Sequence, residues 1–396
     1  MSRIVHLVPE WPTNYQTFVQ DDIEISRTIS NNVSVFGCRT SETGLRGILF
    51  WIRPIGSMLF GYMRFCKFQL HSPRISQRKL PIKLRIRLYI LIGKMPWLLT
   101  EQAVIHAHFL AHTAELGACL GMLNNRIILI VTAHGSEVLM NASSKLIQVA
   151  RKYDYIVCAS SAVLADLNRK AVLLNSKITS SQYVRYCRTH ELTHSSDEIA
   201  AVPAIQIETW RFVSIGRMHP QKGWDICIRL ALELKSRSIK FRWNFIGDGY
   251  EFQRIQRLVY GQGLQNEISL LGRKSRNFCL EMMRESDFTV LPSVITDKDC
   301  DGLPLVILEA MRASSIVIST RVAGIPEAIG EGRGILLDES VENSAQQIVS
   351  LMSDSEGRKN ITKDAKLWVT QNTSIDKSDP LLEVYGSAFR KFADAN

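Results

Sequence analysis

The sequence predicts an α/β protein of two domains, each built on a doubly wound parallel sheet. Three observations support this prediction. Short apolar, β-branched runs alternate with helical segments along the chain, which is typical of β-α-β units. The 396 residues exceed one ordinary core, so two domains of about 150–200 residues are expected. A polar stretch rich in Ser and Thr, residues 173–203, separates two such alternating series.

The first series predicts parallel strands joined by helices. The run RIILIVTAHG is continuously apolar and ends in His-Gly, as expected of a buried parallel strand that leads into a loop. The segment SAVLADLNRK, residues 161–170, is expected to be helical. The predicted strands are residues 3–8, 31–37, 103–109, 126–135 and 153–161.

The second series repeats the pattern after the polar stretch. Its predicted strands are residues 210–216, 241–249, 267–272, 287–293 and 315–320. Helices are expected near residues 223–237, 250–261, 276–285 and 303–313. Ligands of such sheets bind outside the carboxyl ends of the strands, so we expect the site in the cleft between the domains.

The net charge of +10 is unevenly distributed. No acid occurs between Glu42 and Glu101, whereas basic residues are frequent there and alternate with aromatic ones. This combination favours an anionic membrane surface, with a basic solvated face as the alternative and nucleic acid as the least favoured partner. The basic residues are Arg46, Arg53, Arg64, Lys67, Arg74, Arg78, Lys79, Lys83, Arg85, Arg87 and Lys94.

The rest of the composition indicates a globular cytoplasmic protein. The opening apolar run is too short for a secretory signal, and no apolar stretch reaches the ~20 residues of a membrane-spanning helix. The eight cysteines are scattered without metal-like grouping, so we expect reduced thiols.

Two basic residues in the second half are candidates for binding a phosphate. In GRMHPQKG, Arg217 follows a predicted strand and Lys222 precedes a predicted helix. Arg offers a fork of donors and Lys a point charge, which suits a doubly charged phosphate; two ordinary surface cations are the alternative. The turn Gly247-Asp248-Gly249 follows the next strand, and its glycines allow close backbone approach.

The stretch DCDGLPLVILEA places two carboxylates, Asp301 and Glu309, around a predicted helix start. Pro304 is favoured near a first helical turn, and the free N–H groups there can hold an anion. Because the helix is apolar, Glu309 needs a partner; a ligand hydroxyl pair and a buried Arg or backbone cap are both open.

Histidines are candidates in the first half. His134 and Gly135 end the buried apolar strand, where functional loops concentrate, although a lone His there is more often structural. His106, His108 and His112 form the run HAHFLAH, but no third ligand accompanies the pair at i,i+4 spacing. We therefore expect no metal site.

Together, GRMHPQKG, IGDG, SDFTVLPS, DGLPLVILEAM and AGIPEAI resemble the carboxyl domain of glycosyltransferase family 4, which has the GT-B fold. The motifs occur in the order and at the spacing of that family. In the first half, PEWPTNYQTFVQDDI, HAHF and TAHGSEV resemble its polysaccharide-assembly branch, which includes exopolysaccharide and O-antigen enzymes.

The resemblance implies retaining transfer of a sugar from a nucleotide diphosphate sugar, without a cofactor or bound metal. Arg217 and Lys222 match the diphosphate-binding pair of the family. Glu309 matches the acid that binds the nucleotide ribose, and Asp301 the acid near the donor sugar. The backbone of Gly302, Leu303, Pro304 and Leu305 is expected to face sugar and phosphate. His134 matches the histidine that approaches the transferred sugar, so His134 and Asp301 are the predicted catalytic residues.

The resemblance also implies that the two halves of the chain bind different substrates. Residues 1–205 are expected to bind the acceptor and residues 206–375 the nucleotide sugar, and a helix in 376–396 is expected to pack back on the first domain. The expected acceptor is a lipid-linked saccharide, and the expected location is the cytoplasmic face of the plasma membrane. A small soluble acceptor, a catalytically impaired nucleotide-binding homologue and a sugar-nucleotide epimerase are the alternatives.

The sequence departs from the family pattern in three places. Asp301 stands where the family usually has Glu. The segment MRASSIVIST lacks the usual Gly and Pro after the helix. The family's Asn-Gly-Val-Asp segment near the domain boundary is not recognisable around YVRYCRTHEL.

Overall fold

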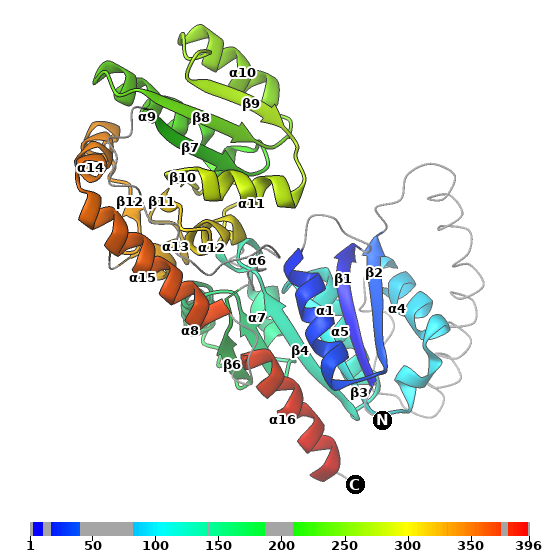
Figure 1. Ribbon diagram of the computed structural model, residues 1–396. Helices are drawn as coiled ribbons and strands as arrows, with labels where there is room; N and C mark the ends of the chain where they lie inside the picture. Colours follow the sequence, from blue (N-terminus) through cyan, green and yellow to red (C-terminus); the bar gives the residue numbers. More distant parts are fainter. Residues whose placement is uncertain are drawn as a thin grey trace. The chain divides into compact units, whose positions relative to one another are not determined.

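The computed structural model describes most of the chain (Figure 1). The described residues are 3–10, 17–39, 82–140, 143–186, 209–330, 332–373 and 379–394. They divide into two compact units, each of which is described by itself. The first comprises Met1–Ala159, Val163–Arg185 and Ile375–Asn396, and the second comprises Ser160–Ala162 and Tyr186–Ser374. The boundary expected near residue 205 lies outside the described residues.

The first unit contains a six-stranded sheet in the order β2-β1-β3-β4-β5-β6. All neighbouring strands are parallel, which confirms the predicted doubly wound architecture. β3 and β4 are buried along their whole length, as their continuous apolar runs predict. The strands are β1 (Arg3–Glu10), β2 (Val33–Arg39), β3 (Ala103–His108), β4 (Ile127–Ala133), β5 (Tyr155–Cys158) and β6 (Ser181–Val184).

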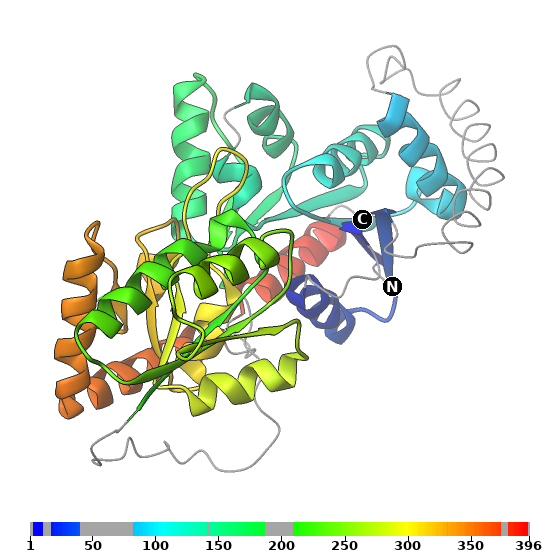
Figure 2. The same ribbon diagram turned by 90° about the horizontal axis from the view of Figure 1, so that it is seen from above.

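Helices cover both faces of this sheet. One core joins it to α4, α5, α7 and α8, and a second core joins its other face to α1 and α16. The carboxyl-terminal helix α16 therefore lies beside α1 in this unit, as Figures 1 and 2 show. The helices are α1 (Thr17–Ile29), α4 (Ile82–Lys94), the 3₁₀ helix η2 (Pro96–Leu99), α5 (His112–Leu123), α6 (Ser136–Leu139), α7 (Ser144–Ala150), α8 (Ser161–Leu173) and α16 (Pro380–Asp394).

The second unit contains another parallel sheet, in the order β12-β11-β10-β7-β8-β9. The strand order reverses at β7, which lies between β10 and β8, and ligands of open α/β sheets bind outside such a point. The strands are β7 (Trp210–Ile215), β8 (Phe241–Ile246), β9 (Ile268–Gly272), β10 (Phe288–Leu291), β11 (Ile316–Ser319) and β12 (Ile335–Leu336).

Two helical layers enclose the second sheet. α9, α10 and α14 share one core with it, and α11, α12, α13 and α15 share the other. The helices are the 3₁₀ helix η3 (Pro220–Lys222), α9 (Trp224–Ser236), α10 (Phe252–Gly261), α11 (Arg276–Glu285), α12 (Leu305–Arg312), α13 (Ile325–Ile329), α14 (Val341–Ser353) and α15 (Ser355–Thr373).

Two strands were not predicted from the sequence. β6 lies in the polar stretch that was expected to be irregular, and it pairs with β5 as an edge strand. None of its four residues is fully buried, so its sequence carries no apolar signal. β12 was missed because its two residues are too few to show any hydrophobic period.

The end of α12 explains the missing Gly noted in MRASSIVIST. Ser314 adopts a left-handed φ of 63° just after the helix. Its N–H donates to the Met311 carbonyl at 3.2 Å, and the Ser315 N–H donates to the Ala310 carbonyl at 3.0 Å. This is the Schellman arrangement, in which glycine is usually favoured. The departure therefore keeps the usual turn with a less favourable residue.

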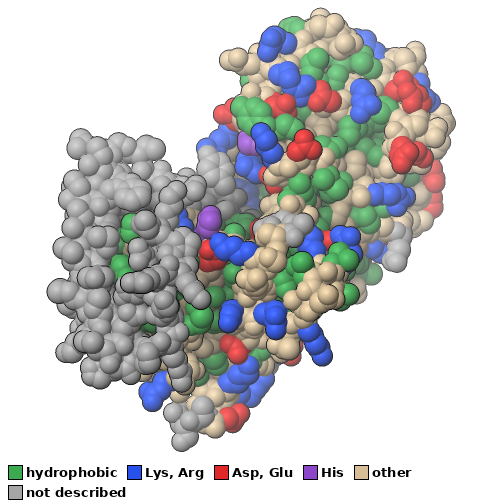
Figure 3. Space-filling view, turned by 180° about the vertical axis from the view of Figure 1, so that it is seen from behind, with side chains coloured by type: hydrophobic (Ala, Val, Ile, Leu, Met, Phe, Trp, Pro, Cys, Tyr) green, Lys and Arg blue, Asp and Glu red, His purple; other side chains and the backbone are tan. Residues whose placement is uncertain are grey.

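The described helices and surface bear on membrane contact. In the part of the chain that is described, no helix is long and apolar enough to cross a membrane. On the face shown in Figure 3, Lys and Arg side chains are interspersed with Asp and Glu. Most of the basic stretch 46–94, including residues 46–81, lies outside the described residues, and so do the side chains of Lys83 and Arg85.

Candidate functional site

The predicted phosphate loop follows β7 at the point where the strand order reverses. Gly223 closes the loop with a left-handed φ of 68° and caps α9. A Cβ atom at Gly223 would lie 1.9 Å from the Pro292 carbonyl oxygen, which follows β10. Only glycine fits there, so the loop after β7 packs directly on the end of β10.

The Gly247-Asp248-Gly249 turn packs on the other side of the same loop. The Met218 N–H donates to the Asp248 carbonyl at 2.8 Å. A Cβ atom at Gly247 would lie 1.8 Å from the Gly216 carbonyl oxygen. The turn thus supports the backbone around Arg217, which agrees with the close backbone approach predicted from its glycines.

The two predicted phosphate-binding cations differ in their surroundings. Arg217 is exposed, and its guanidinium makes no ion pair with any described residue. Burial, with a further contribution from Arg217, lowers the pKa of the neighbouring His219. Lys222 is largely enclosed, and its Nζ lies 2.8 and 2.9 Å from the two carboxylate oxygens of Asp301.

This ion pair places Asp301 beside the loop that carries Lys222. The buried Ser293 donates its hydroxyl to Asp301 Oδ2 at 2.5 Å. Gly302, Leu303 and Pro304 follow as buried residues that lead into α12. α12 begins at Leu305, directly after Pro304, which is its N-cap.

Glu309 has a protein partner, which was one of the two predicted alternatives. Arg276 Nη2 lies 2.5 Å from Glu309 Oε1, and Arg276 Nε lies 3.1 Å from the same oxygen. Glu309 is buried, while the Arg276 side chain is 31% exposed, so the pair reaches the surface through the arginine. Sequence reasoning missed Arg276 because it is 33 residues from Glu309 and opens a different helix.

His134 lies in the first unit, at the carboxyl end of β4. The Glu137 carboxylate accepts hydrogen bonds from the His134 N–H at 2.7 Å and the Gly135 N–H at 3.0 Å. Gly135 has a φ of 139°, a conformation that side-chain-bearing residues rarely adopt. Glu137 thus holds the loop of His134 in place. Nothing in the sequence beyond its proximity pointed to that role.

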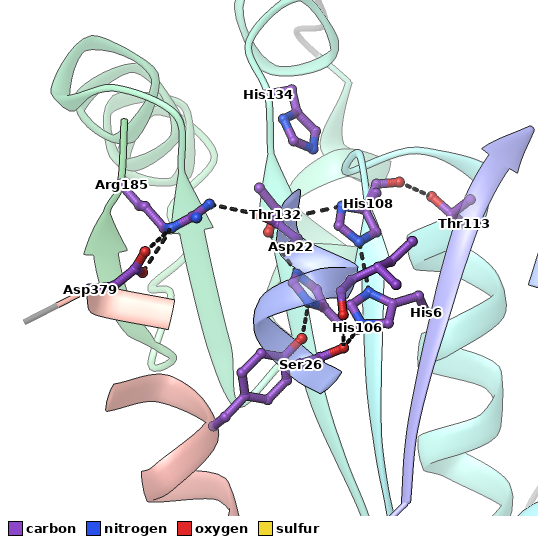
Figure 4. A network of polar contacts seen from close by, with 12 residues as sticks. His6, Asp22, Ser26, His106, His108, Thr113, Thr132, His134, Arg185 and Asp379 are labelled. Atoms are coloured by element: carbon purple, nitrogen blue, oxygen red, sulfur yellow. Dashed lines mark hydrogen bonds and ion pairs between the residues drawn. The ribbon is translucent and has the colours of Figure 1, made fainter. Parts of the chain in front are cut away.

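His134 stands at the edge of a group of buried histidines in the same unit (Figure 4). The His108 and His134 rings stack with their centroids 5.9 Å apart, and the His106 and His108 rings with theirs 4.4 Å apart. His6 completes the group from β1, with Nδ1 3.0 Å from His108 Nε2. Burial is the main cause that lowers the pKa of each of these four histidines, to about 3 for His108.

The hydrogen bonds of this group indicate a structural role. Ser26 donates to the Ile23 carbonyl, so it accepts from His6 Nε2, and both ring nitrogens of His106 contact hydroxyls, those of Tyr385 and Thr132. The ring nitrogens of His6, His106 and His108 lie within 4.8 Å of one another. A metal ion would have to displace these hydrogen bonds. His112 lies apart from the group, with an exposed side chain near Glu115.

An ion-pair network adjoins the histidines. Arg185 Nη1 lies 2.6 Å from Asp22 Oδ1, and Arg185 Nε lies 2.9 Å from Asp379 Oδ1. Asp22 Oδ2 faces His108 Nδ1 at 3.7 Å. Burial raises the pKa of Asp22 to about 6, against the opposing effect of Arg185. The network fixes the segment before α16 to α1 and to the end of β6.

Comparisons with known proteins agree with the fold. Residues 195–368 match the family model of glycosyl transferases group 1. An uncharacterized glycosyltransferase of Methanocaldococcus jannaschii is 29% identical over 66% of this chain and 69% of its own. A putative colanic acid biosynthesis glycosyltransferase of Salmonella typhimurium is 26% identical over 62% of this chain, and the match spans 60% of that relative's length.

A solved structure extends the comparison to nearly the whole chain. Anabaena HepE in complex with UDP superposes with a TM-score of 0.65 over 99% of this chain and 100% of its own, at 15% identity. At this identity the similarity concerns the fold, which is GT-B. The fold and the sequence matches define a glycosyltransferase. Over residues 195–368 the chain is similar to the group 1 glycosyltransferases.

Proposed function

We propose that the chain transfers a sugar, with retention of configuration, from a nucleotide diphosphate sugar to a lipid-linked saccharide in polysaccharide biosynthesis. The observation that carries this proposal is the ion pair of Lys222 and Asp301, which lies beside the loop that carries Arg217 at the point where the strand order reverses. Cations beside a loop of backbone N–H groups suit a diphosphate, and an acid next to them suits the hydroxyls of the attached sugar.

Each predicted residue receives a role in this proposal. Arg217 and Lys222 bind the diphosphate and stabilise the negative charge that develops on it when the glycosidic bond breaks. Asp301 accepts hydrogen bonds from the donor sugar, and Glu309 does so from the ribose, with Arg276 holding its carboxylate. His134 is assigned to the transferred sugar on the resemblance alone. The diphosphate charge is met by side chains, so we propose that no bound metal is needed.

The names of the relatives support a role in polysaccharide biosynthesis and a nucleotide donor. The Salmonella typhimurium relative is named for colanic acid biosynthesis, and HepE was solved with UDP. A saccharide on a lipid carrier would bring this chain to the inner face of the plasma membrane as a peripheral protein. The acid-free basic stretch suits the anionic lipid there.

A thermal-shift panel tests the donor half of the proposal. Purified protein is melted with UDP, GDP, ADP and their common sugar conjugates, with and without EDTA. A ligand at 100 times its Kd stabilises the protein by ~2.7 kcal/mol, so a true donor raises the melting temperature clearly. We expect one nucleotide series to do so equally in EDTA. If none stabilises the protein, the donor assignment is wrong.

The acceptor half needs a separate measurement. With the labelled donor and a membrane lipid extract, label is expected in the organic phase. Label that appears only in water-soluble product, with a sugar acceptor added, would support the small soluble acceptor instead. Donor binding without any transfer would support the catalytically impaired homologue.

A further inference from the structure

Lys222 is already neutralised by an acid of the same site. Its Nζ contacts both carboxylate oxygens of Asp301, at 2.8 and 2.9 Å. Both side chains are largely enclosed, with 13% and 14% of their surface exposed. An ion pair with so little water around it is screened less than a surface pair. A phosphate that binds Lys222 must therefore either share its ammonium group with the Asp301 carboxylate or displace that carboxylate from it.

The position of both partners is restricted. The Lys222 side chain lies over Gly216, where a Cβ atom would contact its Cδ and Cε atoms at 3.6 and 3.7 Å. Ser293, which is fully buried after β10, holds Asp301 Oδ2 at 2.5 Å. Neither group can move far from the other without breaking these contacts.

Asp301 retains some capacity to bind a ligand. A carboxylate has about four lone-pair sites, and contacts with Lys222 and Ser293 account for three of them among the described residues. Oδ1 has one such contact and Oδ2 has two. A sugar hydroxyl could therefore donate to Oδ1 while the ion pair persists.

We propose that Asp301 is a specificity-determining residue that competes with the diphosphate for Lys222, so that the site binds a nucleotide sugar in preference to the nucleoside diphosphate alone. The inference rests on the proposed function. The phosphates of a nucleoside diphosphate are repelled by the Asp301 carboxylate and form no hydrogen bond with it. The phosphates of a nucleotide sugar are repelled in the same way, but its sugar hydroxyls donate hydrogen bonds to the carboxylate.

The same competition has a consequence for turnover. Once the sugar has been transferred, the nucleoside diphosphate that remains no longer contacts Asp301 through the sugar. The carboxylate then favours return of Lys222 to the ion pair and so favours release of this product. Arg217, which is exposed and unpaired with any described acid, is not subject to this competition.

The test is calorimetric titration of UDP, GDP and ADP into four full-length proteins: wild type, Asp301→Asn, Asp301→Glu and Asp225→Asn. Asp301→Asn removes the competing charge and keeps the shape. Asp301→Glu keeps the charge. Asp225→Asn is the matched control, since Asp225 is three residues from Lys222 but pairs with Arg254 at 2.8 Å. Circular dichroism melts confirm that each variant is folded.

We expect Asp301→Asn to bind the preferred diphosphate about tenfold tighter than wild type, which corresponds to about 1.4 kcal/mol. Asp301→Glu and Asp225→Asn should stay within about twofold of wild type, because neither frees Lys222. The corresponding nucleotide sugar should gain less from Asp301→Asn than the diphosphate does, so the preference for the sugar falls.

The outcomes separate this inference from the proposed function. If wild type binds a diphosphate and Asp301→Asn binds it equally or more weakly, the competition is overturned while the donor site stands. Equal tightening in Asp301→Asn and Asp225→Asn would assign the effect to overall charge and also overturn it. If no protein of the four binds any diphosphate, the proposed function itself fails.

Discussion

At the scale of single residues, the two cations of the phosphate loop are the first test of the site. Arg217→Ala and Lys222→Ala should each weaken nucleoside diphosphate binding while the fold survives. Hydrogen bonds to charged groups contribute roughly 1.5–3 kcal/mol, so the loss should be about tenfold or more. The loss should be larger for Arg217, since Lys222 is partly neutralised by Asp301.

Titration calorimetry measures both affinities, with Arg257→Ala as a control. Arg257 is an exposed residue of α10 whose Nε donates to the Gln253 carbonyl, outside the site. Unchanged affinity in both loop variants would remove the phosphate assignment.

Variants of the two acids, Glu309 and Asp301, should affect the nucleotide and the sugar of the donor differently. Glu309→Gln is expected to weaken nucleotide binding, whereas Asp301→Asn is not, because Glu309 is assigned to the ribose and Asp301 to the sugar. Asp301→Asn should act mainly on kcat. Arg276→Ala should resemble Glu309→Gln, since it leaves a buried carboxylate without its cation. Steady-state kinetics with the identified donor measures the split; a larger KM effect for Asp301→Asn would reverse the assignment.

At the scale of elements, the turn after α12 makes a stability prediction. Ser314 adopts a left-handed conformation that costs a residue with a side chain roughly 1–2 kcal/mol and costs glycine little. Ser314→Gly should therefore raise the free energy of unfolding, by up to about 1 kcal/mol once the greater freedom of unfolded glycine is subtracted.

Urea unfolding measures this change. Ser353→Gly is a useful comparison, because Ser353 ends α14 within the helix and glycine there should destabilise. A Ser314→Gly variant less stable than wild type would mean that the serine side chain contributes contacts that the turn geometry does not show.

Local sequence signals predicted the elements unevenly. The apolar runs of β3, β4 and β10 and the glycine loops after β7 and β8 were recognisable, because their composition alone sets burial or backbone conformation. β6 and β12 were not, since an edge strand and a two-residue strand have no period to detect. At the candidate site, the residues that lie on the family motifs were predicted as candidates. Ser293, Arg276 and Glu137 were not assigned roles. Arg276 meets Glu309 only through the fold, and the contacts of Ser293 with Asp301 and of Glu137 with the His134 loop depend on the local course of the backbone.

At the scale of the whole molecule, a cluster of four histidines, three of them buried and His134 partly buried, predicts how stability depends on pH. His6, His106, His108 and His134 have lowered pKa values when folded and ordinary ones near 6.5 when unfolded. Their contribution is therefore complete above pH 6.5 and is lost as the pH falls below it. Burial also raises the pKa of Asp22, to about 6, and that of Glu137; these two acids act in the opposite direction at low pH, but the four histidines outweigh them.

Melting temperatures at pH 7.5 and 5.0 measure the net effect. Wild type should melt at a clearly lower temperature at pH 5.0. In His6→Gln the difference between the two pH values should shrink, because one buried titrating group is gone. His112→Gln, at an exposed position outside the group, should keep the wild-type difference. An equal shift in both variants would contradict the assignment.

Membrane attachment through residues 46–94 is a second prediction at this scale. Each basic residue near an anionic leaflet contributes on the order of 1 kcal/mol, and the attraction acts within a Debye length of ~8 Å at physiological salt. Co-sedimentation with anionic vesicles should therefore decrease as salt rises, with little binding to neutral vesicles. Reversing Lys83, Arg85 and Arg87 to Glu should reduce it without changing nucleotide affinity. Equal binding to both vesicle types would exclude an electrostatic attachment.

The most direct test of the central claim is sugar transfer that depends on the second unit's site. Labelled nucleotide sugars are incubated with a membrane lipid extract and either wild type or the Arg217→Ala/Glu309→Gln double variant, and label in the organic phase is counted. We predict that wild type transfers label from one nucleotide sugar and that the double variant, folded by circular dichroism, transfers at least about a hundredfold less, as the loss of two contacts to charged groups implies. Equal transfer by both proteins would show that the donor is bound elsewhere and would contradict the account.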